Sequence, residues 1–182
     1  MRGLPQPRTE LLSTAFGDLE YLVAGVGPAV PVTVFAHGRN SGIAETRPLG
    51  SGVPGRKVFF HFRGYGRSAP APEPWYPADD LRAVADYVGA TRAVGASMGA
   101  AAVGTLADRF ARVVLYLPAV VTPVPVPALV LACRDDPVHP VGVAEEIAAA
   151  SPRAVLYVFD RPAPICSARA ELRHRIAGFL AE

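Results

Sequence analysis

The stretch Arg92-Ala93-Val94-Gly95-Ala96-Ser97-Met98-Gly99-Ala100 joins a short apolar run, a Gly-x-Ser-x-Gly pattern and a segment of small residues. This order predicts a strand that ends at a sharp turn carrying Ser97 and leads directly into a helix. Side chains two positions before and after the serine would collide at such a turn, and the two glycines remove them. The turn would lift the hydroxyl of Ser97 above the edge of a sheet, beside free N–H groups at a helix N-terminus. The alternative is a turn of small residues that only packs a helix against a sheet.

Apolar runs rich in β-branched and aromatic residues recur along the chain and predict further strands. They cover residues 11–16, 19–23, 32–36, 57–62, 112–117, 127–132 and 154–159, besides the shorter run 92–96. Gly17-Asp18 separates the first two runs and indicates a hairpin turn. The later runs are continuous, which is typical of strands buried on both faces of a parallel sheet.

Segments with helical periodicity lie between these runs. One begins at Pro77, and the others cover residues 97–109, 140–150 and about 168–181. Asp79 and Asp80 suit the first turn of a helix, and Pro140 is placed to open the third segment. Strands that alternate with helices predict an α/β fold, with a mostly parallel sheet of seven or eight strands and helices on both faces.

Length and composition restrict the class of protein. The chain has 182 residues, of which 51% are apolar and 19% charged, and its formal net charge is +2. This predicts one domain, residues 1–182, with a real hydrophobic core, and excludes wholesale disorder. The net charge is too small to indicate binding to nucleic acid or to a membrane surface. Residues 1–10 carry no targeting signal and no run approaches the ~18 apolar residues that span a bilayer, so we expect a cytoplasmic protein.

The two cysteines, Cys133 and Cys166, cannot form a disulfide framework, and no CxxC or HExxH pattern is present. We therefore expect free thiols, no metal and no cofactor. The expected partner is a small-molecule substrate.

Five motifs resemble those of the α/β-hydrolase superfamily, in that family's order and over nearly the whole chain. They are the opening hairpin and turn (Gly17-Asp18-Leu19-Glu20-Tyr21 and Gly25-Val26-Gly27-Pro28), the strand and His-Gly loop (Val34-Phe35-Ala36-His37-Gly38), the Arg-Gly-x-Gly-x-Ser loop (Arg63-Gly64-Tyr65-Gly66-Arg67-Ser68), the nucleophile elbow around Ser97, and the acid segment (Asp136-Pro137-Val138-His139-Pro140). The resemblance implies an α/β-hydrolase fold, with Ser97 as the nucleophile and Asp136 in the position of the catalytic acid. It also implies an oxyanion hole formed by the backbone N–H groups of Met98 and Arg39. Arg63 and Arg67 are expected to brace their loop.

Three departures from the family pattern matter. The family usually inserts a cap domain between the strands expected at 112–117 and 127–132, whereas here only residues 118–126 join them, so we expect no cap. The Asp that usually precedes the Arg-Gly-x-Gly-x-Ser loop by two residues is replaced by His61. The catalytic histidine is missing from its usual loop after the last strand, which reads Asp160-Arg161-Pro162-Ala163-Pro164-Ile165-Cys166-Ser167.

A serine nucleophile needs a base within hydrogen-bond reach, and four histidines are available. His174 points away from the apolar stripe of its helix and is interpreted as a surface residue. His37 belongs to the His-Gly loop, where the resemblance implies a structural role, and His61 is expected to be packed or partly exposed. His139 follows Asp136 by three residues at the sheet edge where α/β sites form. It is the candidate base, and the alternative is a helix-cap or surface residue.

The function of Asp136 depends on that base, because a triad acid orients an imidazole and stabilises its charged form. The alternative is a simple turn residue. The adjacent Asp135 could take the same place after a shift of one residue.

Three functions are consistent with this pattern. The first is a serine hydrolase of a small or medium ester or thioester that forms an acyl-enzyme at Ser97. The second is a non-hydrolytic biosynthetic enzyme, catalysing a cyclisation or lactonisation at the same site. The third is a catalytically silent binding protein that keeps the elbow for folding. Fold-level analogy alone does not decide between them.

An uncapped sheet edge exposes apolar residues that a cap would cover. Candidates for such a patch are Tyr65, Trp75, Tyr76 and the Val-Pro connector. Because exposed apolar patches tend to be covered by partners, we expect a homodimer whose second chain partly roofs the site.

Overall fold

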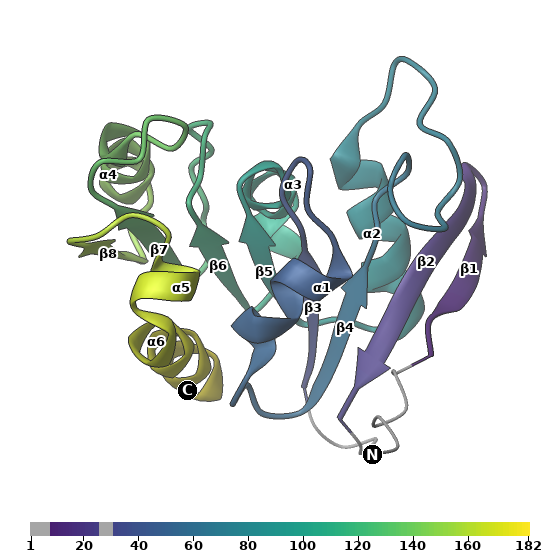
Figure 1. Ribbon diagram of the computed structural model, residues 1–182, viewed down its shortest axis with the longest axis horizontal. Coiled ribbons are helices and arrows are strands. Elements are labelled where there is room, and N and C mark those ends of the chain that lie inside the picture. Colours follow the sequence, from purple (N-terminus) through teal and green to yellow (C-terminus); the bar gives the residue numbers. More distant parts are fainter. Residues whose placement is uncertain (1–7, 26–30) are drawn as a thin grey trace.

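The computed structural model describes residues 8–25 and 31–182 (Figure 1). An eight-stranded sheet forms its centre, in the order β1-β2-β4-β3-β5-β6-β7-β8. The strands are β1 (Glu10–Thr14), β2 (Gly17–Ala24), β3 (Val32–Ala36), β4 (Arg56–Phe60), β5 (Arg92–Ala96), β6 (Arg112–Tyr116), β7 (Ala128–Cys133) and β8 (Ala154–Phe159). Every apolar run that predicted a strand forms one.

The sheet is mostly parallel, as the continuous apolar runs predict. Strand β2 runs antiparallel to its two neighbours β1 and β4, and all other neighbouring pairs are parallel. Parallel strands end at the same edge, so the loops that follow β3, β5, β7 and β8 meet there. The candidate site residues of the sequence lie on these loops.

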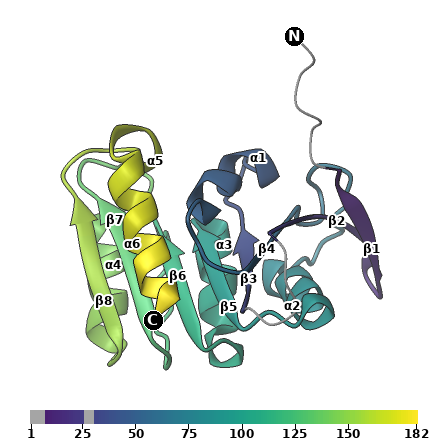
Figure 2. The same cartoon turned by 90° about the horizontal axis from the view of Figure 1, so that it is seen from below.

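Helices cover both faces of the sheet (Figure 2). They are α1 (Ile43–Thr46), α2 (Pro77–Val88), α3 (Met98–Thr105), α4 (Val141–Ala150), α5 (Pro164–Ser167) and α6 (Arg169–Ala181), with short 3-10 turns η1 (Arg47–Gly50) and η2 (Ala107–Arg109). Helices α2, α3 and α4 pack on one core of alternate strand residues, and α1, η1 and α6 pack on the other. This alternation follows from the two-residue period of a strand.

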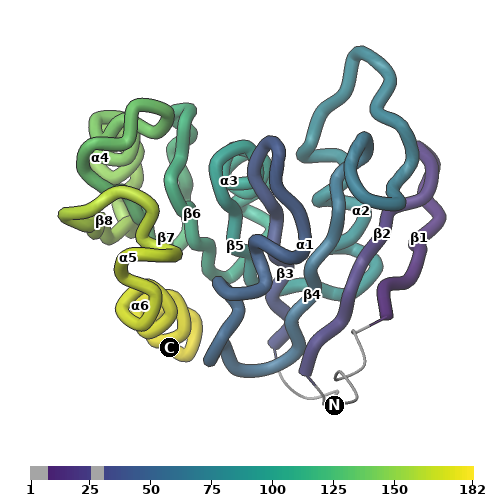
Figure 3. The backbone as a smooth tube through the Cα atoms, viewed as in Figure 1, coloured from purple at the N-terminus to yellow at the C-terminus, as the bar shows by residue number. Residues whose placement is uncertain are grey.

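The connector between β6 and β7 forms no helix and runs as a plain loop (Figure 3). Val120 and Val121 are exposed there, whereas Val124 is buried. No cap domain is present in the described part of the chain, which confirms the prediction from the short connector.

The structure corrects several local predictions. The hairpin turn is formed by Ala15 and Phe16, and Gly17, with a φ of 111°, is already the first residue of β2. Pro140 occupies the N-cap position just before α4, and the first helical residue is Val141. Strand β8 lies at the sheet edge and is not buried on both faces, since Val155 is 60% exposed. Of the turn expected at 25–28, residues 26–28 lie outside the described part of the chain.

The expected apolar patch is smaller than the sequence indicates. Tyr76 is exposed, but Tyr65 and Trp75 pack against the core, and the indole N–H of Trp75 donates to the carboxylate of Asp80. The homodimer stays a prediction.

Candidate active site

The turn between β5 and α3 has the geometry that the glycine spacing predicts. Ser97 joins the two elements with φ 52° and ψ −111°, a conformation that costs a non-glycine residue about 1–3 kcal/mol. A Cβ on Gly95 would overlap the backbone carbonyl of Gly99, and a Cβ on Gly99 would overlap that of Ala36. Only glycine fits at both positions. The two glycines therefore allow the strained backbone turn at Ser97.

His139 links Ser97 to Asp136. Its Nε2 lies 2.9 Å from the Oγ of Ser97, and its Nδ1 lies 2.9 Å from the Oδ2 of Asp136. An ionised carboxylate can only accept hydrogen bonds, so Nδ1 of His139 carries the proton and donates to Asp136. In the neutral imidazole Nε2 then accepts from the hydroxyl of Ser97. The structure thus brings together the three residues that the sequence proposed as nucleophile, base and acid.

The carboxylate of Asp136 is held by its own loop. Its Oδ1 accepts the backbone N–H groups of Val138 and His139, at 2.9 and 3.1 Å. Burial alone would raise the pKa of Asp136, but the hydrogen bonds from the His139 side chain and these two N–H groups outweigh burial and lower the pKa below its usual value. The thiol of Cys133 lies 3.8 Å from Oδ2. Asp136 is therefore a charged, fixed acceptor at neutral pH.

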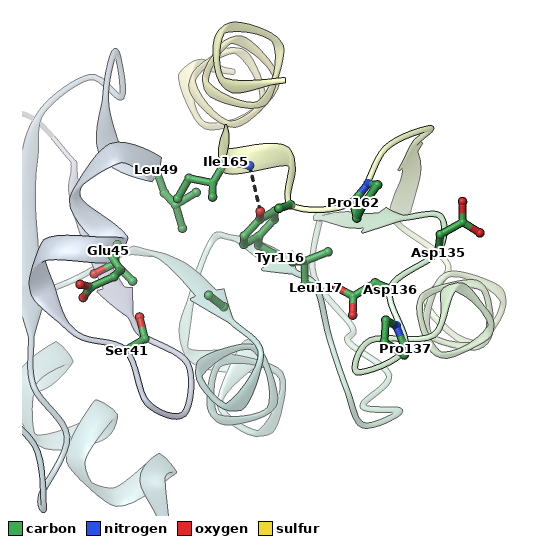
Figure 4. A pocket seen from close by; sticks show the side chains of 13 residues that line it. Ser41, Glu45, Leu49, Tyr116, Leu117, Asp135, Asp136, Pro137, Pro162 and Ile165 are labelled. Atoms are coloured by element: carbon green, nitrogen blue, oxygen red, sulfur yellow. Dashed lines mark hydrogen bonds between the residues drawn. The ribbon is translucent and has the colours of Figure 1, made fainter. Parts of the chain in front are cut away.

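Asp135 does not share this arrangement. It adopts a φ of 59° and is exposed. Figure 4 shows its carboxylate pointing away from that of Asp136. The alternative of a one-residue shift therefore finds no support in the contacts.

The remaining histidines have other contacts. The Nε2 of His37 accepts the N–H of Phe62, so its Nδ1 carries the proton and donates to the carbonyl of Gly38 at 2.7 Å. The Nε2 of His61 accepts the N–H of Ile43, and its Nδ1 donates to Glu20 at 2.9 Å. Both rings are thus fully engaged in holding loops.

His174 is exposed on α6, as the position opposite the apolar stripe predicts. Of the four histidines, His139 is the one that contacts Ser97.

The loop after β3 passes directly over the elbow. A Cβ on Gly38 would lie 3.2 Å from the Cβ of Ser97, so the backbone that leads to Arg39 runs beside Ser97. On the other side, Met98 is the first residue of α3, and its N–H therefore has no intrahelical acceptor. These are the two amides that the sequence proposed for an oxyanion hole.

Two arginines brace the neighbouring loop. The Nε of Arg63 donates to the Oδ1 of the fully buried Asp80 at 2.6 Å, and its backbone N–H donates to Oδ2 at 2.9 Å. The backbone N–H of Arg67 donates to Glu20. Arg63 and Arg67 thus hold the loop in place, and neither side chain forms a hydrogen bond with Ser97.

A cavity of about 400 Å³ lies beside the elbow and is lined in part by Asp136 (Figure 4). Its lining is mostly apolar and comes from the ends of β5 and β6 and from the segments that follow β3, β6, β7 and β8, including α1, η1 and α5: Ser41, Glu45, Thr46, Leu49, Ala96, Tyr116, Leu117, Asp135, Asp136, Pro137, Pro162, Ala163 and Ile165. The buried hydroxyl of Tyr116 accepts the N–H of Ile165 at 3.3 Å, which ties α5 to the cavity wall. The sequence did not predict this lining, because α1, η1 and α5 are too short to give a periodic signal.

A second cavity, of about 360 Å³, lies on the other side of the elbow, between α2 and α3. Tyr76, Met98, Ala101 and Thr105 are among its lining residues. Ala96 and Met98, the two chain neighbours of Ser97, thus line different cavities.

Within residues 8–25 and 31–182, no group of three or more His, Cys, Asp or Glu side chains is arranged to hold a metal ion. Among the helices of that part of the chain, none is both long and apolar enough to cross a membrane. Cys133 and Cys166 are free thiols.

Comparison with solved structures decides the fold. An enol-lactonase from Burkholderia xenovorans superposes with a TM-score of 0.86 at 16% identity, over 95% of this chain and 100% of that chain. A hydrolase from Pseudomonas aeruginosa gives 0.83 at 17%, over 98% and 100%, and an alpha-beta serine hydrolase homologue from Coxiella burnetii gives 0.83 at 20%, over 97% and 99%. The chain has the α/β-hydrolase fold. No family model and no curated protein matches the sequence.

At identities this low, the structural similarity establishes the α/β-hydrolase fold but not the activity, which has to be inferred from the residues of the site. The similar structures include hydrolases, an esterase and an enol-lactonase. Within the α/β-hydrolase fold of this chain, the loop after β8 supplies cavity wall, and the loop after β7 supplies the imidazole that contacts Ser97.

Proposed function

We propose that the protein is a serine hydrolase of small or medium, neutral esters or thioesters. The observation that carries the proposal is the continuous chain of hydrogen bonds from the Oγ of Ser97 through the imidazole of His139 to the carboxylate of Asp136. A hydroxyl, a neutral imidazole and an ionised carboxylate in this order form an activated nucleophile. A protein that kept the elbow only for folding would not need the second and third members of this chain.

The chemistry then runs in two steps. The Oγ of Ser97 attacks the ester carbonyl while Nε2 of His139 takes the hydroxyl proton. When the tetrahedral intermediate collapses, the imidazolium returns that proton to the departing alcohol or thiol, which leaves an acyl group on Ser97. His139 next takes a proton from water, the hydroxide attacks the acyl carbonyl, and the acid product leaves as Ser97 regains its proton. Asp136 holds the imidazole and stabilises its charged form.

The backbone N–H groups of Met98 and Arg39 are the proposed donors to the oxyanion. Two such donors stabilise the transition state by a few kcal/mol. The Gly38 carbonyl and the Arg39 N–H belong to one trans peptide unit and point in opposite directions. The hydrogen bond from His37 to that carbonyl therefore fixes the direction of the Arg39 N–H. In this proposal His37 is a positioning residue for the oxyanion hole.

The two cavities support the assignment of the substrate class. Cavities of roughly 300–1,000 Å³ hold small molecules, and the larger cavity beside Ser97 is near the lower limit. Since Ala96 and Met98 line opposite cavities, an ester bound at Ser97 directs its acyl and alcohol parts to different sides. The apolar lining of the cavity beside Tyr116 favours an uncharged chain there.

Labelling with a fluorophosphonate tests the nucleophile directly. The wild-type protein should form one covalent adduct at Ser97, and Ser97→Ala should form none. Hydrolysis of p-nitrophenyl acetate, butyrate, hexanoate and decanoate should pass through a maximum at short or medium chains. A folded protein that neither labels nor hydrolyses these esters would reject the hydrolase and favour the binding-protein or the non-hydrolytic reading.

A further inference from the structure

A third hollow, of about 500 Å³, lies away from the triad, where α6 packs against η1. Neither Ser97 nor His139 nor Asp136 is part of its lining. The wall combines cationic side chains with Ser51, the edge of Phe59 and the backbone around Gly50. It is therefore a separate site with a different chemical character.

Three cations from three different elements line this hollow. Arg47 comes from η1, Lys57 from β4 and Arg173 from α6, and no acidic residue lies in the lining. None of the three takes part in an ion pair with another described residue. The undescribed residues 1–7 and 26–30 contain no Asp or Glu, so those segments cannot supply an acidic side chain.

Glu171, two residues from Arg173, accepts hydrogen bonds from Tyr157 and Arg175. Glu45, two residues from Arg47, also faces away from the hollow. A Cβ on Gly42 would lie 3.5 Å from the Oε2 of Glu45 and would overlap the ring of His61. This places the carboxylate of Glu45 on the side of His61, whereas Arg47 lines the hollow. The positive charge of the hollow is thus not neutralised from within its own wall.

Two of these side chains, Arg173 and Lys57, have N–H groups that no described residue accepts. The Nε of Arg173 is buried and has no hydrogen-bond partner among the described residues. The ammonium of Lys57, the single lysine of the chain, donates to the carbonyls of Val53 and Gly55 at 3.0 and 3.3 Å, which fixes it in position and leaves one proton free. An unpaired donor is unfavourable, so an acceptor bound against the guanidinium of Arg173 would stabilise the site.

We propose that this hollow binds the phosphate group of a phosphorylated small molecule. Phosphate carries the charge and the several acceptor oxygens that two guanidinium groups and one ammonium can share. The volume of the hollow, about 500 Å³, leaves room for an organic part attached to the phosphate. A single carboxylate would leave most of these donors unpaired.

The site shares a wall with the candidate active site. Within one short segment, Thr46 and Leu49 line the cavity beside Ser97, while Arg47 and Gly50 line the cationic hollow. A phosphate that pairs with Arg47 and Arg173 would join η1 to α6 and restrain this wall. Binding should therefore raise the melting temperature and alter the KM of ester hydrolysis.

Titration calorimetry at constant ionic strength tests the site with three probes: inorganic phosphate, AMP and adenosine. Phosphate and AMP should bind at one site and adenosine should not, and tighter binding of AMP would identify an esterified rather than a free phosphate. Arg173→Gln and Arg47→Gln should each weaken binding about tenfold, since each removes a charge-assisted hydrogen bond. Arg153→Gln, which removes the same charge from an exposed position, should bind like the wild type.

Ser97→Ala should bind phosphate normally, so the result is independent of the proposed hydrolase activity. Bound phosphate should also protect Lys57 from reductive methylation, measured by peptide mass spectrometry against the N-terminal amine. Absence of binding by both phosphate and AMP would overturn the proposal. Equal weakening in all three arginine variants would do so as well, because it would indicate only non-specific attraction.

Discussion

The imidazole Nε2 of His139 lies 2.9 Å from the hydroxyl Oγ of Ser97, although 42 positions separate the two residues in the chain. One short loop after β7 supplies both this imidazole and the carboxylate that orients it. The loop is able to do so because Oδ1 of Asp136 accepts two N–H groups of the following turn, while Oδ2 accepts from the ring of His139. Ser97, His139 and Asp136 are thus linked by hydrogen bonds although the loop after β8 carries no histidine.

Replacement of His139 by alanine tests this relationship. The turnover of a p-nitrophenyl ester should fall by a factor on the order of 10⁴ or more, because no other imidazole contacts Ser97. His174→Ala removes an exposed imidazole from α6 and should leave the turnover unchanged. Full activity in His139→Ala would exclude it as the base.

The two adjacent acids give a second, matched pair of variants. Asp136→Asn should lower kcat roughly 10³–10⁴-fold, because an amide in place of Oδ2 favours the wrong tautomer of His139. Asp135→Asn should change kcat little, since Asp135 is exposed and asparagine tolerates its φ of 59°. The reverse order of effects would assign the acid to Asp135.

The strands, the elbow and the absence of a cap could be predicted from the sequence because each depends on local pattern. The elbow requires glycine at positions 95 and 99, because a Cβ at either would overlap backbone atoms, so the motif itself predicts the turn. The spacing of three residues between Asp136 and His139 also identifies His139 as the candidate base.

Other features depend on contacts between distant segments and had no local signal. The pairing of His61 with Glu20, which removes His61 as a base, joins positions 41 residues apart. Helix α5 has only four residues, yet it closes the cavity through the bond from the N–H of Ile165 to Tyr116. Likewise, the sequence places Trp75 in an exposed patch, whereas its indole N–H donates to the carboxylate of Asp80 and the ring packs against the core.

Removal of a buried hydroxyl in β3 should stabilise the folded protein. The Oγ1 of Thr33 is fully buried and has no hydrogen-bond partner among the described residues. Thr33→Val should raise the free energy of unfolding by about 1 kcal/mol, because the unpaired group is replaced by a methyl of similar size. In contrast, Thr46→Val should lower it, since that hydroxyl donates to Gly42 at 2.8 Å. Urea unfolding measures both, and destabilisation by Thr33→Val would mean that its hydroxyl has a partner.

The buried His37 predicts how stability depends on pH. Burial, with a smaller effect from the nearby His61, lowers the pKa of His37 from 6.5 to about 4. Between these two values the unfolded chain binds a proton that the folded protein does not bind. The free energy of unfolding should therefore fall as the pH decreases, by about 2 kcal/mol from pH 7 to pH 5 for this group alone.

His37→Asn isolates this contribution, because asparagine offers a donor and an acceptor but does not titrate. Urea unfolding of both proteins at pH 7, 6 and 5 should show that the wild type loses more stability than the variant, with the difference growing toward low pH. Carboxylates that titrate in this range affect both proteins alike and cancel in the comparison. Parallel curves would mean that His37 accepts a proton equally well in the folded state, which is incompatible with the hydrogen bond that its Nε2 accepts from the N–H of Phe62.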